Sequence, residues 1–223
     1  MTQPRELSPH LRALAILGLF FVLAFALSGC GSPEPEVVPE AGAPEASGGE
    51  ETVSEVSTAV EEVAVVTTNH GTMVFRFFPE EAPLTVAHVK GLIADGFFDG
   101  KTFYRVVAGH VIQGGEGFDT EGGETVVGEF GAHPHVTGAV GLARDEDPDS
   151  GSTEIYICLE PRPHLDGSYA IFGLLTEGFD VLAAIGAVEV EEQWDGEVAF
   201  HRPLEPVVIE SLRLETRPVA AGS

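Results

Sequence analysis

"TFYRVVAGHVIQGGE", residues 102 to 116, is the stretch of sequence that decides the fold. Its aliphatic residues favour two short β-strands, one on each side of a bend at Ala108-Gly109. Arg105 and Gln113 interrupt this apolar pattern before and after the bend. Positions of equal parity lie on one face of a strand, although a bend can reset that register. The question is why a β-rich core places a guanidinium and an amide where they can share a face.

Short strands and two helices are indicated around this stretch. From Val63 to Phe77 the sequence alternates around a turn at Asn69 to Gly71, which is typical of a β-hairpin. Apolar residues between Val86 and Ile93 recur at helical spacing, and Gly96 suits the end of a helix. Further strands are predicted at 102–107, 110–113, 126–130, 138–143, 154–159 and 169–174, a second helix at 178–188, and a closing strand at 205–215. The pattern predicts a mainly β domain, a barrel capped at its ends.

Three blocks of the sequence resemble the cyclophilin-type peptidyl-prolyl isomerases. They are "FYRVVAGHVIQGGE" (103–116), "GAVGLARDEDPDSGSTEIYICL" (138–159) and "HLDGSYAIFGLLTEGFDVL" (164–182), in the order that the family has them. The likeness covers residues 63 to 216. It implies a closed eight-stranded antiparallel β-barrel with two capping α-helices, and an isomerase that acts on proline-containing polypeptides without a cofactor or a metal.

The resemblance also implies roles for single residues. Arg105 matches the catalytic arginine, and Gln113 matches the glutamine that hydrogen-bonds the substrate backbone. Both would point into the substrate groove, which would explain why two polar side chains interrupt these strands. The other residues that the resemblance places along the substrate are Phe103, His110, Val111, Ala143, Glu154, Tyr156, His164, Leu165 and Tyr169.

Several of these residues depart from the family pattern. His110 stands where the family has a pocket phenylalanine, and Glu154 where a glutamine is common. Val111 replaces a methionine, Tyr156 a phenylalanine, His164 a tryptophan and Tyr169 a histidine. An ordinary histidine titrates near pH 6.5, so His110 predicts that activity falls between about pH 8 and about pH 5.5. A non-catalytic peptide-binding module or chaperone remains the alternative function.

An arginine suits this chemistry for a physical reason. Rotation about an X-Pro bond breaks amide resonance, with a barrier of roughly 18–20 kcal/mol. The prolyl nitrogen gains a lone pair in the twisted transition state, so a fixed donor stabilises that state more than the planar one. Arg105 would supply such a donor from a rigid, permanently charged guanidinium.

The first thirty residues predict export. Arg5 and Arg12 precede an apolar run from Ala13 to Leu27, which is shorter than the about 20 residues of a membrane span. "LSGC", ending at Cys30, resembles the bacterial lipobox. This implies a signal peptide at 1–29 and an acylated Cys30 that anchors the protein to a lipid bilayer. The protein would then lie in the cell envelope, facing the periplasm or the exterior, and an uncleaved membrane anchor is the alternative.

Composition sets the remaining expectations. Residues 31 to 62 hold nine glutamates and no Lys or Arg among Pro, Gly, Ala and Ser, so 30–62 is interpreted as a disordered acidic linker and 217–223 as a tail. The chain has 36 acidic and 11 basic residues and a formal net charge of -25, which disfavours a nucleic-acid partner. A saline habitat is one explanation for this charge. We expect a monomer, with Cys158 as a buried thiol.

Two apparent metal sites are rejected. Residues 145–150 place carboxylates at alternate positions, but Ser150 and Tyr156 stand where a calcium loop needs glycine and glutamate. His133 and His135 have no third ligand at a useful spacing, so we interpret them as structural histidines.

Overall fold

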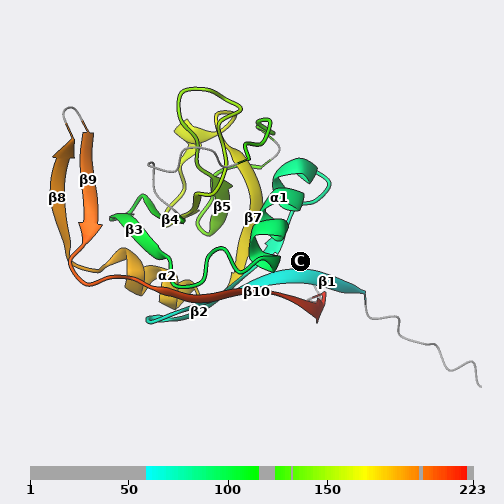
Figure 1. Ribbon diagram of the computed structural model, residues 1–223, viewed down its shortest axis with the longest axis horizontal. Coiled ribbons are helices and arrows are strands. Elements are labelled where there is room, and N and C mark those ends of the chain that lie inside the picture. Colours follow the sequence, from blue (N-terminus) through cyan, green and yellow to red (C-terminus); the bar gives the residue numbers. More distant parts are fainter. Residues whose placement is uncertain (1–58, 116–123, 132, 196–197, 220–223) are drawn as a thin grey trace, which may run out of the picture. The chain divides into compact units, whose positions relative to one another are not determined.

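The computed structural model describes residues 59–115, 124–131, 133–195 and 198–219 (Figure 1). The strands are β1 (Val60–Thr68), β2 (Gly71–Phe77), β3 (Thr102–Val107), β4 (Val111–Gly115), β5 (Ala139–Leu142), β6 (Ile155–Cys158), β7 (Ala170–Glu177), β8 (Val190–Asp195), β9 (Val198–Pro203) and β10 (Ile209–Pro218). The helices are α1 (Pro83–Ala94), α2 (Phe179–Gly186) and the short 3-10 helix η1 (Pro163–Leu165). The domain is therefore mainly β with two α-helices within the described residues, as the sequence predicted.

Eight of the strands form one antiparallel sheet in the order β10-β1-β2-β7-β5-β6-β4-β3. Its outer strands approach each other at one isolated bridge, Thr102 with Val208, flanked by hydrogen bonds from Phe103 N to Val207 O (2.9 Å) and from Ile209 N to Lys101 O (2.8 Å). No continuous ladder joins β3 to β10 in the described part of the chain. The predicted eight-stranded antiparallel sheet is thus confirmed and is curled, but its closure into a barrel is not confirmed.

The core lies inside this curl, under the two helices. Helix α1 contacts β7 and β10, and α2 contacts β2, β3 and β4. Val89 of α1 and Ile185 of α2 are fully buried, and Phe75 and Phe172 meet edge to face at 6.1 Å between ring centroids. Each buried aliphatic or aromatic side chain of this kind stabilises the fold by roughly 1.5–3 kcal/mol. Cys158 is buried and free as predicted, and burial raises the pKa of its thiol to about 12.

The prediction of a strand at 126–130 is wrong, and one residue of this segment caps helix α1 instead. Only Val126 is bridged, to Gly151. The carboxylate of Glu129 accepts hydrogen bonds from Leu84 N at 3.1 Å, Thr85 N at 2.8 Å and the Thr85 hydroxyl at 2.8 Å. Helix α1 has no cap from its own N-cap residue, Ala82, so this distant carboxylate satisfies the first amides of the helix.

The structure contains a hairpin that was not predicted from the sequence. Strands β8 and β9 pair as a separate two-stranded sheet, and β9 lies next to β3. The signal was present, because Asp195-Gly196 is a strong hairpin dipeptide between two alternating segments. Figure 1 shows this hairpin beside β3.

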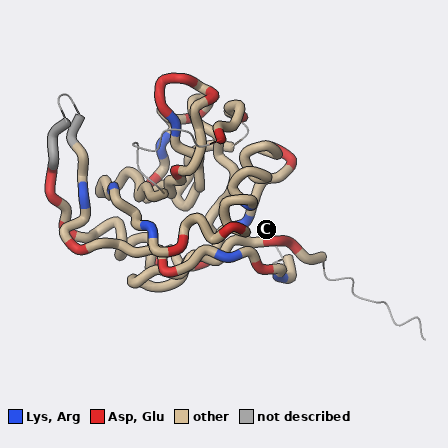
Figure 2. Tube along the Cα trace, in the orientation of Figure 1, with Lys and Arg blue, Asp and Glu red and all other residues tan. Residues whose placement is uncertain are grey.

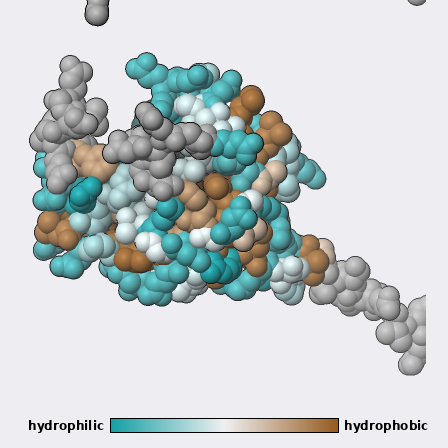
Figure 3. Space-filling model, viewed as in Figure 1, coloured by the Kyte–Doolittle hydropathy of each residue, from teal (hydrophilic) through white to brown (hydrophobic). Residues whose placement is uncertain are grey.

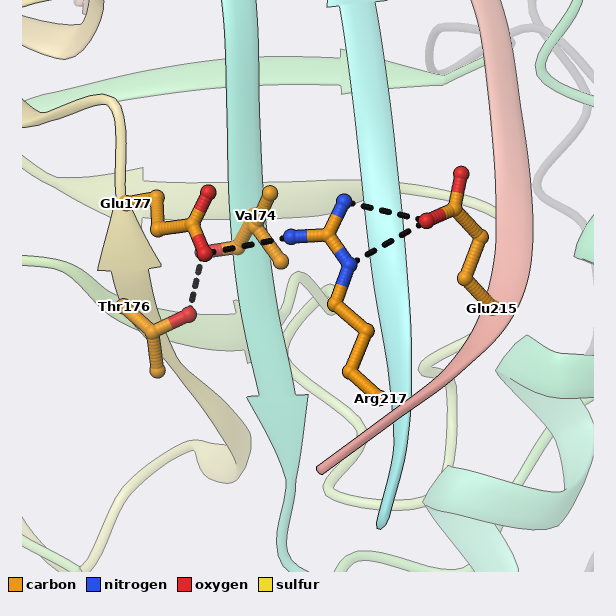
Figure 4. A network of polar contacts seen from close by, with 5 residues as sticks. All are labelled: Val74, Thr176, Glu177, Glu215 and Arg217. Atoms are coloured by element: carbon orange, nitrogen blue, oxygen red, sulfur yellow. Dashed lines mark hydrogen bonds and ion pairs between the residues drawn. The ribbon is translucent and has the colours of Figure 1, made fainter. Parts of the chain in front are cut away.

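Polar contacts also tie the outer face of the sheet together. Arg217 of β10 donates hydrogen bonds to Glu177 of β7 at 3.1 Å and to Glu215 at 3.0 and 3.1 Å, and the Thr176 hydroxyl donates to Val74 O (Figure 4). These side chains are partly exposed, so each ion pair contributes at most about 1 kcal/mol.

The view in Figure 3 is mostly hydrophilic, with hydrophobic residues scattered among the polar ones. None of the helices in the described part of the chain combines the length and the apolar character that crossing a bilayer requires.

Candidate functional site

A cavity of about 260 Å³ opens beside the β3–β4 hairpin. Its walls come from strands β3, β4 and β6 of the sheet, the β3–β4 turn, the loops after β5 and β6, and strand β9 of the second hairpin. The lining residues are Arg105, His110, Val111, Gln113, Ala143, Arg144, Tyr156, Leu165, Tyr169 and Phe200. One end is apolar and the other carries the guanidinium and amide groups, so the cavity can hold a ring beside a polar backbone.

Arg105 and Gln113 share a face of the sheet. They lie directly opposite each other in the β3–β4 register, and the bend at Ala108-Gly109 preserves that register. Arg105 Nη1 donates to Gln113 Oε1 at 3.0 Å. Burial lowers the pKa of Arg105, while Tyr104, Tyr169 and Glu154 favour its charge. A guanidinium remains a cation at neutral pH nonetheless.

Glu154 and Tyr104 hold the other end of the Gln113 amide. Gln113 Nε2 donates to Glu154 Oε2 at 2.5 Å and to the Tyr104 hydroxyl oxygen at 3.2 Å, and that hydroxyl donates to Glu154. Both amide hydrogens are therefore used, so the carbonyl oxygen must face Arg105. Burial raises the pKa of Glu154, and burial followed by the hydrogen bond to Glu154 raises the pKa of Tyr104.

A chain of polar groups, which runs from the buried Tyr156 through His135 to the exposed Asp166, supports the apolar end of the cavity. The ring of Tyr156 packs over Gly141, where a Cβ atom would lie 2.2 Å from Tyr156 Cζ. The Tyr156 hydroxyl lies 2.8 Å from His135 Nε2, and His135 Nδ1 lies 2.7 Å from Asp166 Oδ1. The backbone amide and the ring of His135 lower the pKa of Asp166. His135 is 1% exposed and is a structural histidine, as predicted.

His133, the other histidine considered as a metal ligand, stacks on Phe78 at 3.8 Å between ring centroids and lies 3.2 Å from Glu81. Within the described residues no group of three or more His, Cys, Asp or Glu could hold a metal ion. The acidic loop at 145–149 is exposed, as expected of a solvated loop.

His110 lies at the rim of the cavity. Its ring stacks on His164 of η1 with centroids 5.9 Å apart and an interplanar angle of 20°. Burial lowers the pKa of His110, and the nearby charges of Arg162 and Arg105 lower it further. The carboxylate of Glu154 is directed to Gln113 and Tyr104 rather than across the groove to His110.

Eight of the eleven residues assigned to the substrate line this cavity. The other three lie elsewhere. Phe103 is 0% exposed in the core, because the register of β3 shifts between Thr102 and Arg105 and takes Phe103 off the face of Arg105 despite their equal parity. Glu154 lies behind Gln113, and His164 reaches the site only through His110.

Arg144 and Phe200 also line the cavity, although neither was predicted from the sequence as a site residue. The Arg144 guanidinium lies 4.8 Å from the centroid of the Tyr169 ring, and its Nε donates to Ser168 O at 2.9 Å. Phe200 stacks on Tyr104 with centroids 5.7 Å apart and ring planes within 8°. Recognising the Asp195-Gly196 sequence signal would have placed Phe200 on a strand, but the contact of Phe200 with Tyr104 of β3 depends on tertiary structure.

Comparisons with known proteins agree with this geometry. Residues 63–214 match the family described as "Cyclophilin type peptidyl-prolyl cis-trans isomerase/CLD". A peptidyl-prolyl cis-trans isomerase of Synechococcus elongatus is 41% identical over 113 residues, which are 49% of this chain and 77% of that protein. One of Helicobacter pylori is 33% identical over 147 residues, covering 63% of this chain and 90% of that protein.

A solved structure supports the fold. The crystal structure of a Cryptosporidium parvum cyclophilin type peptidyl-prolyl cis-trans isomerase in the presence of the dipeptide Ala-Pro has a TM-score of 0.60 and 24% sequence identity, and the match covers 69% of this chain and 98% of that one. The family match, spanning most of the chain, carries the assignment of activity. The chain belongs to the cyclophilin-type peptidyl-prolyl cis-trans isomerases and is an enzyme that interconverts the cis and trans forms of X-Pro bonds.

Proposed function

We propose that the cavity beside the β3–β4 hairpin is the active site and that Arg105 is its catalytic residue. The observation that carries this proposal is the position of the guanidinium. Arg105 is held by Gln113 at the polar end of the cavity, next to the apolar surface of Val111, Tyr156 and Leu165. A proline ring would pack on that apolar surface, and its nitrogen would then lie towards the guanidinium.

In this mechanism Arg105 acts through the prolyl nitrogen. The lone pair that develops during rotation accepts a hydrogen bond from the guanidinium, and the planar ground state offers no such acceptor. Partial burial strengthens this interaction, because less water competes for the donor. The ring stays in the apolar pocket while the chain before the proline rotates.

Gln113 holds the substrate and the arginine together. Its amide hydrogens are occupied by Glu154 and Tyr104, so it meets the substrate through its carbonyl oxygen. That oxygen accepts one bond from Arg105 and has a second lone pair for a substrate N–H. Gln113 is expected from the resemblance to bind the substrate backbone, and this orientation favours a backbone N–H as the group that it binds.

The test is Arg105→Ala, assayed by NMR exchange on a short Ala-Pro peptide. Loss of a transition-state donor costs roughly 2.7–4 kcal/mol, so kcat/KM should fall by roughly 10²–10³-fold. Stability should change little, because the side chain lines a cavity and is not in the core. Arg217→Ala, on the outer face of the sheet, is the matched control and should keep full activity. Unchanged turnover in Arg105→Ala contradicts the assigned role.

We further propose that the enzyme works outside the cytoplasm on exported polypeptides, anchored to a membrane through an acylated Cys30. This rests on the basic start, the apolar run and "LSGC" in the sequence. Residues 1–58, including Cys30 and most of the linker, lie outside the described residues. Acyl chains on Cys30 would anchor the domain stably, since each buried CH₂ contributes about 0.8 kcal/mol.

Cys30→Ser tests the anchor. The variant should lose detergent-phase partitioning and membrane attachment while its isomerase activity is unchanged, because Cys30 precedes the domain. Mass spectrometry of the mature wild-type protein should find acyl chains on Cys30. A mature protein that begins elsewhere, or that carries an unmodified Cys30, disproves the anchor without touching the assignment of the active site.

A further inference from the structure

The proposed active site is basic in a protein that is otherwise acidic. The chain has a formal net charge of -25, and Figure 2 shows the Lys and Arg positions as few and separate among many Asp and Glu. Two of the arginines, Arg105 and Arg144, nevertheless line the same cavity, together with His110. None of the described residues that line it is an aspartate or a glutamate.

Neither of these arginines is neutralised by an ion pair within the described part of the chain. Arg105 donates to an amide oxygen, and Arg144 donates to the backbone carbonyls of Ser168, Asp145 and Glu146. Cations on the outer surface behave differently. Arg213 lies 2.6 Å from Asp99, and Lys90 lies 2.6 Å from Glu62. The cavity therefore keeps positive charge that is cancelled at these other positions.

The nearest acid, Glu154, acts on Arg105 but forms no ion pair with either arginine. Glu154 lies under Gln113 and bonds to Gln113 and Tyr104, so its carboxylate is committed to neutral partners. Burial raises its pKa, which disfavours its charged form. Burial lowers the pKa of His110, and the positive charges of Arg162 and Arg105 lower it further.

Arg144 is also fixed in place. Its guanidinium lies over the ring of Tyr169 at 4.8 Å and near that of Phe130 at 5.5 Å, and its Nε–H is bound to Ser168 O. Contacts with two aromatic faces and a carbonyl restrict the rotamers of the long side chain. A ligand carboxylate that binds the Arg144 guanidinium therefore loses little affinity to side-chain ordering, because folding has already fixed this side chain.

We propose that Arg144 gives this enzyme a preference for X-Pro substrates that carry an acidic residue next to the proline. The inference rests on the proposed active site and names its substrate class. A glutamate or aspartate flanking a proline in the cavity lies within reach of Arg105 and Arg144. The acidic loop 145–149 follows Arg144 directly, but it is exposed and none of its residues lines the cavity. A lysine at the same position meets like charge, so discrimination comes from repulsion as well as attraction.

The experiment compares peptides that differ only beside the proline. One series has Glu, Gln or Lys before the proline and a second has the same residues after it, and NMR exchange gives kcat/KM for each. In the wild type, Glu should exceed Gln in one series by roughly two- to fivefold, the size expected of a partly exposed ion pair, and Lys should fall below Gln. The preference should appear mainly in KM and shrink in roughly 0.5 M salt as charges are screened.

Variants assign the preference to Arg144. In Arg144→Gln the ratio of Glu to Gln peptides should fall to about one, whereas Arg217→Gln should keep the wild-type ratio. Arg144→Lys retains the charge without the planar fork, so it should keep a smaller preference, and it serves as the second variant if Arg144→Gln does not fold.

Each outcome has one meaning. Equal kcat/KM for Glu, Gln and Lys peptides in the wild type overturns the proposal while leaving the isomerase assignment intact. A preference that survives unchanged in Arg144→Gln overturns the role of Arg144. Full activity of Arg105→Ala on the neutral peptide would instead remove the proposed active site, which separates that failure from this one.

Discussion

The hydroxyl group of Tyr156 shows how one substitution in the pocket is accommodated. A buried hydroxyl without a partner costs free energy, so a tyrosine here needs both space and a hydrogen bond. Gly141 supplies the space and His135 the partner, and Asp166 holds His135 in turn. The sequence revealed the tyrosine but not these partners, because they come from different segments that only the folded chain brings together.

A testable prediction concerns the protonation of His110. Its neutral form is favoured in the folded enzyme, because burial and the charges of Arg162 and Arg105 lower its pKa. Protonation of His110 should therefore weaken proline binding only below about pH 6.5, its ordinary value, and the fall expected between about pH 8 and about pH 5.5 moves to lower pH. Because the folded-state pKa is the lower one, His110 should also contribute to a loss of folding stability as pH decreases below about 6.5.

The measurement is a pH profile of kcat/KM for wild type and His110→Phe. The variant should show a flatter profile on the acid side and bind apolar X-Pro peptides more tightly. His70→Phe, at the exposed β1–β2 turn, is the control and should follow the wild type. Identical profiles for wild type and His110→Phe, in the range where both stay folded, would show that His110 has no part in binding.

Among the elements, the β8–β9 hairpin changes the site most. It brings Phe200 against Tyr104, and Tyr104 belongs to the hydrogen-bonded group that orients Gln113. The hairpin therefore forms one wall of the cavity. It also packs on Tyr104, which helps to hold Gln113 beside Arg105. An exposed two-stranded hairpin is only marginally stable by itself, so this packing also fixes the hairpin.

Phe200→Ala should lower kcat/KM while leaving the domain folded. An aromatic pair contributes roughly 0.5–1.5 kcal/mol beyond its buried area, which corresponds to roughly two- to twelvefold if the loss falls on substrate binding. Peptides with a large residue near the proline should lose more than Ala-Pro peptides. Leu204→Ala, an exposed position just after β9, is the control. Equal kcat/KM in wild type and Phe200→Ala would mean that the hairpin does not contribute to the site.

The sequence predicted elements well where alternation or helical spacing coincides with burial. Residues 102–107 are the strand β3 as predicted, and Pro83–Ala94 is the predicted helix. Prediction failed at 126–130, where Glu129 instead caps a helix 44 residues away in sequence. Side chains that line the cavity from β3, β4 and β6 were found through the motif, whereas Arg144 and Phe200 depended on tertiary contacts.

The whole molecule carries a large excess of negative charge. Like charges in excess repel one another in the compact state, and salt reduces this repulsion by shortening the Debye length from about 30 Å at 0.01 M to about 3 Å at 1 M. The described surface pairs, such as Arg217 with Glu177, are too few to cancel the acidic excess.

The free energy of unfolding should therefore rise with NaCl concentration between roughly 0.01 and 1 M, as measured by urea denaturation with an unchanged m value. Glu146→Gln, in the exposed acidic loop, should stabilise the domain at low salt and have less effect at high salt. A free energy of unfolding that stays flat or falls with salt contradicts the repulsion argument. A saline habitat stays a prediction.

The pairing of β1 with β10 has a consequence for how the domain is made. Strand β1 is hydrogen-bonded to β2 on one side and to β10 on the other, from Val60 opposite Pro218 to Thr68 opposite Ile209. The ladder beside β1 is thus completed by β10, which is the last of the described strands in sequence and therefore the last of them to be synthesised. Until β10 emerges, β1 presents an unpaired edge that other strands could join, and closing so long a loop is slow. The export proposed above, with the amino end delivered first, would require that edge to be protected until β10 arrives.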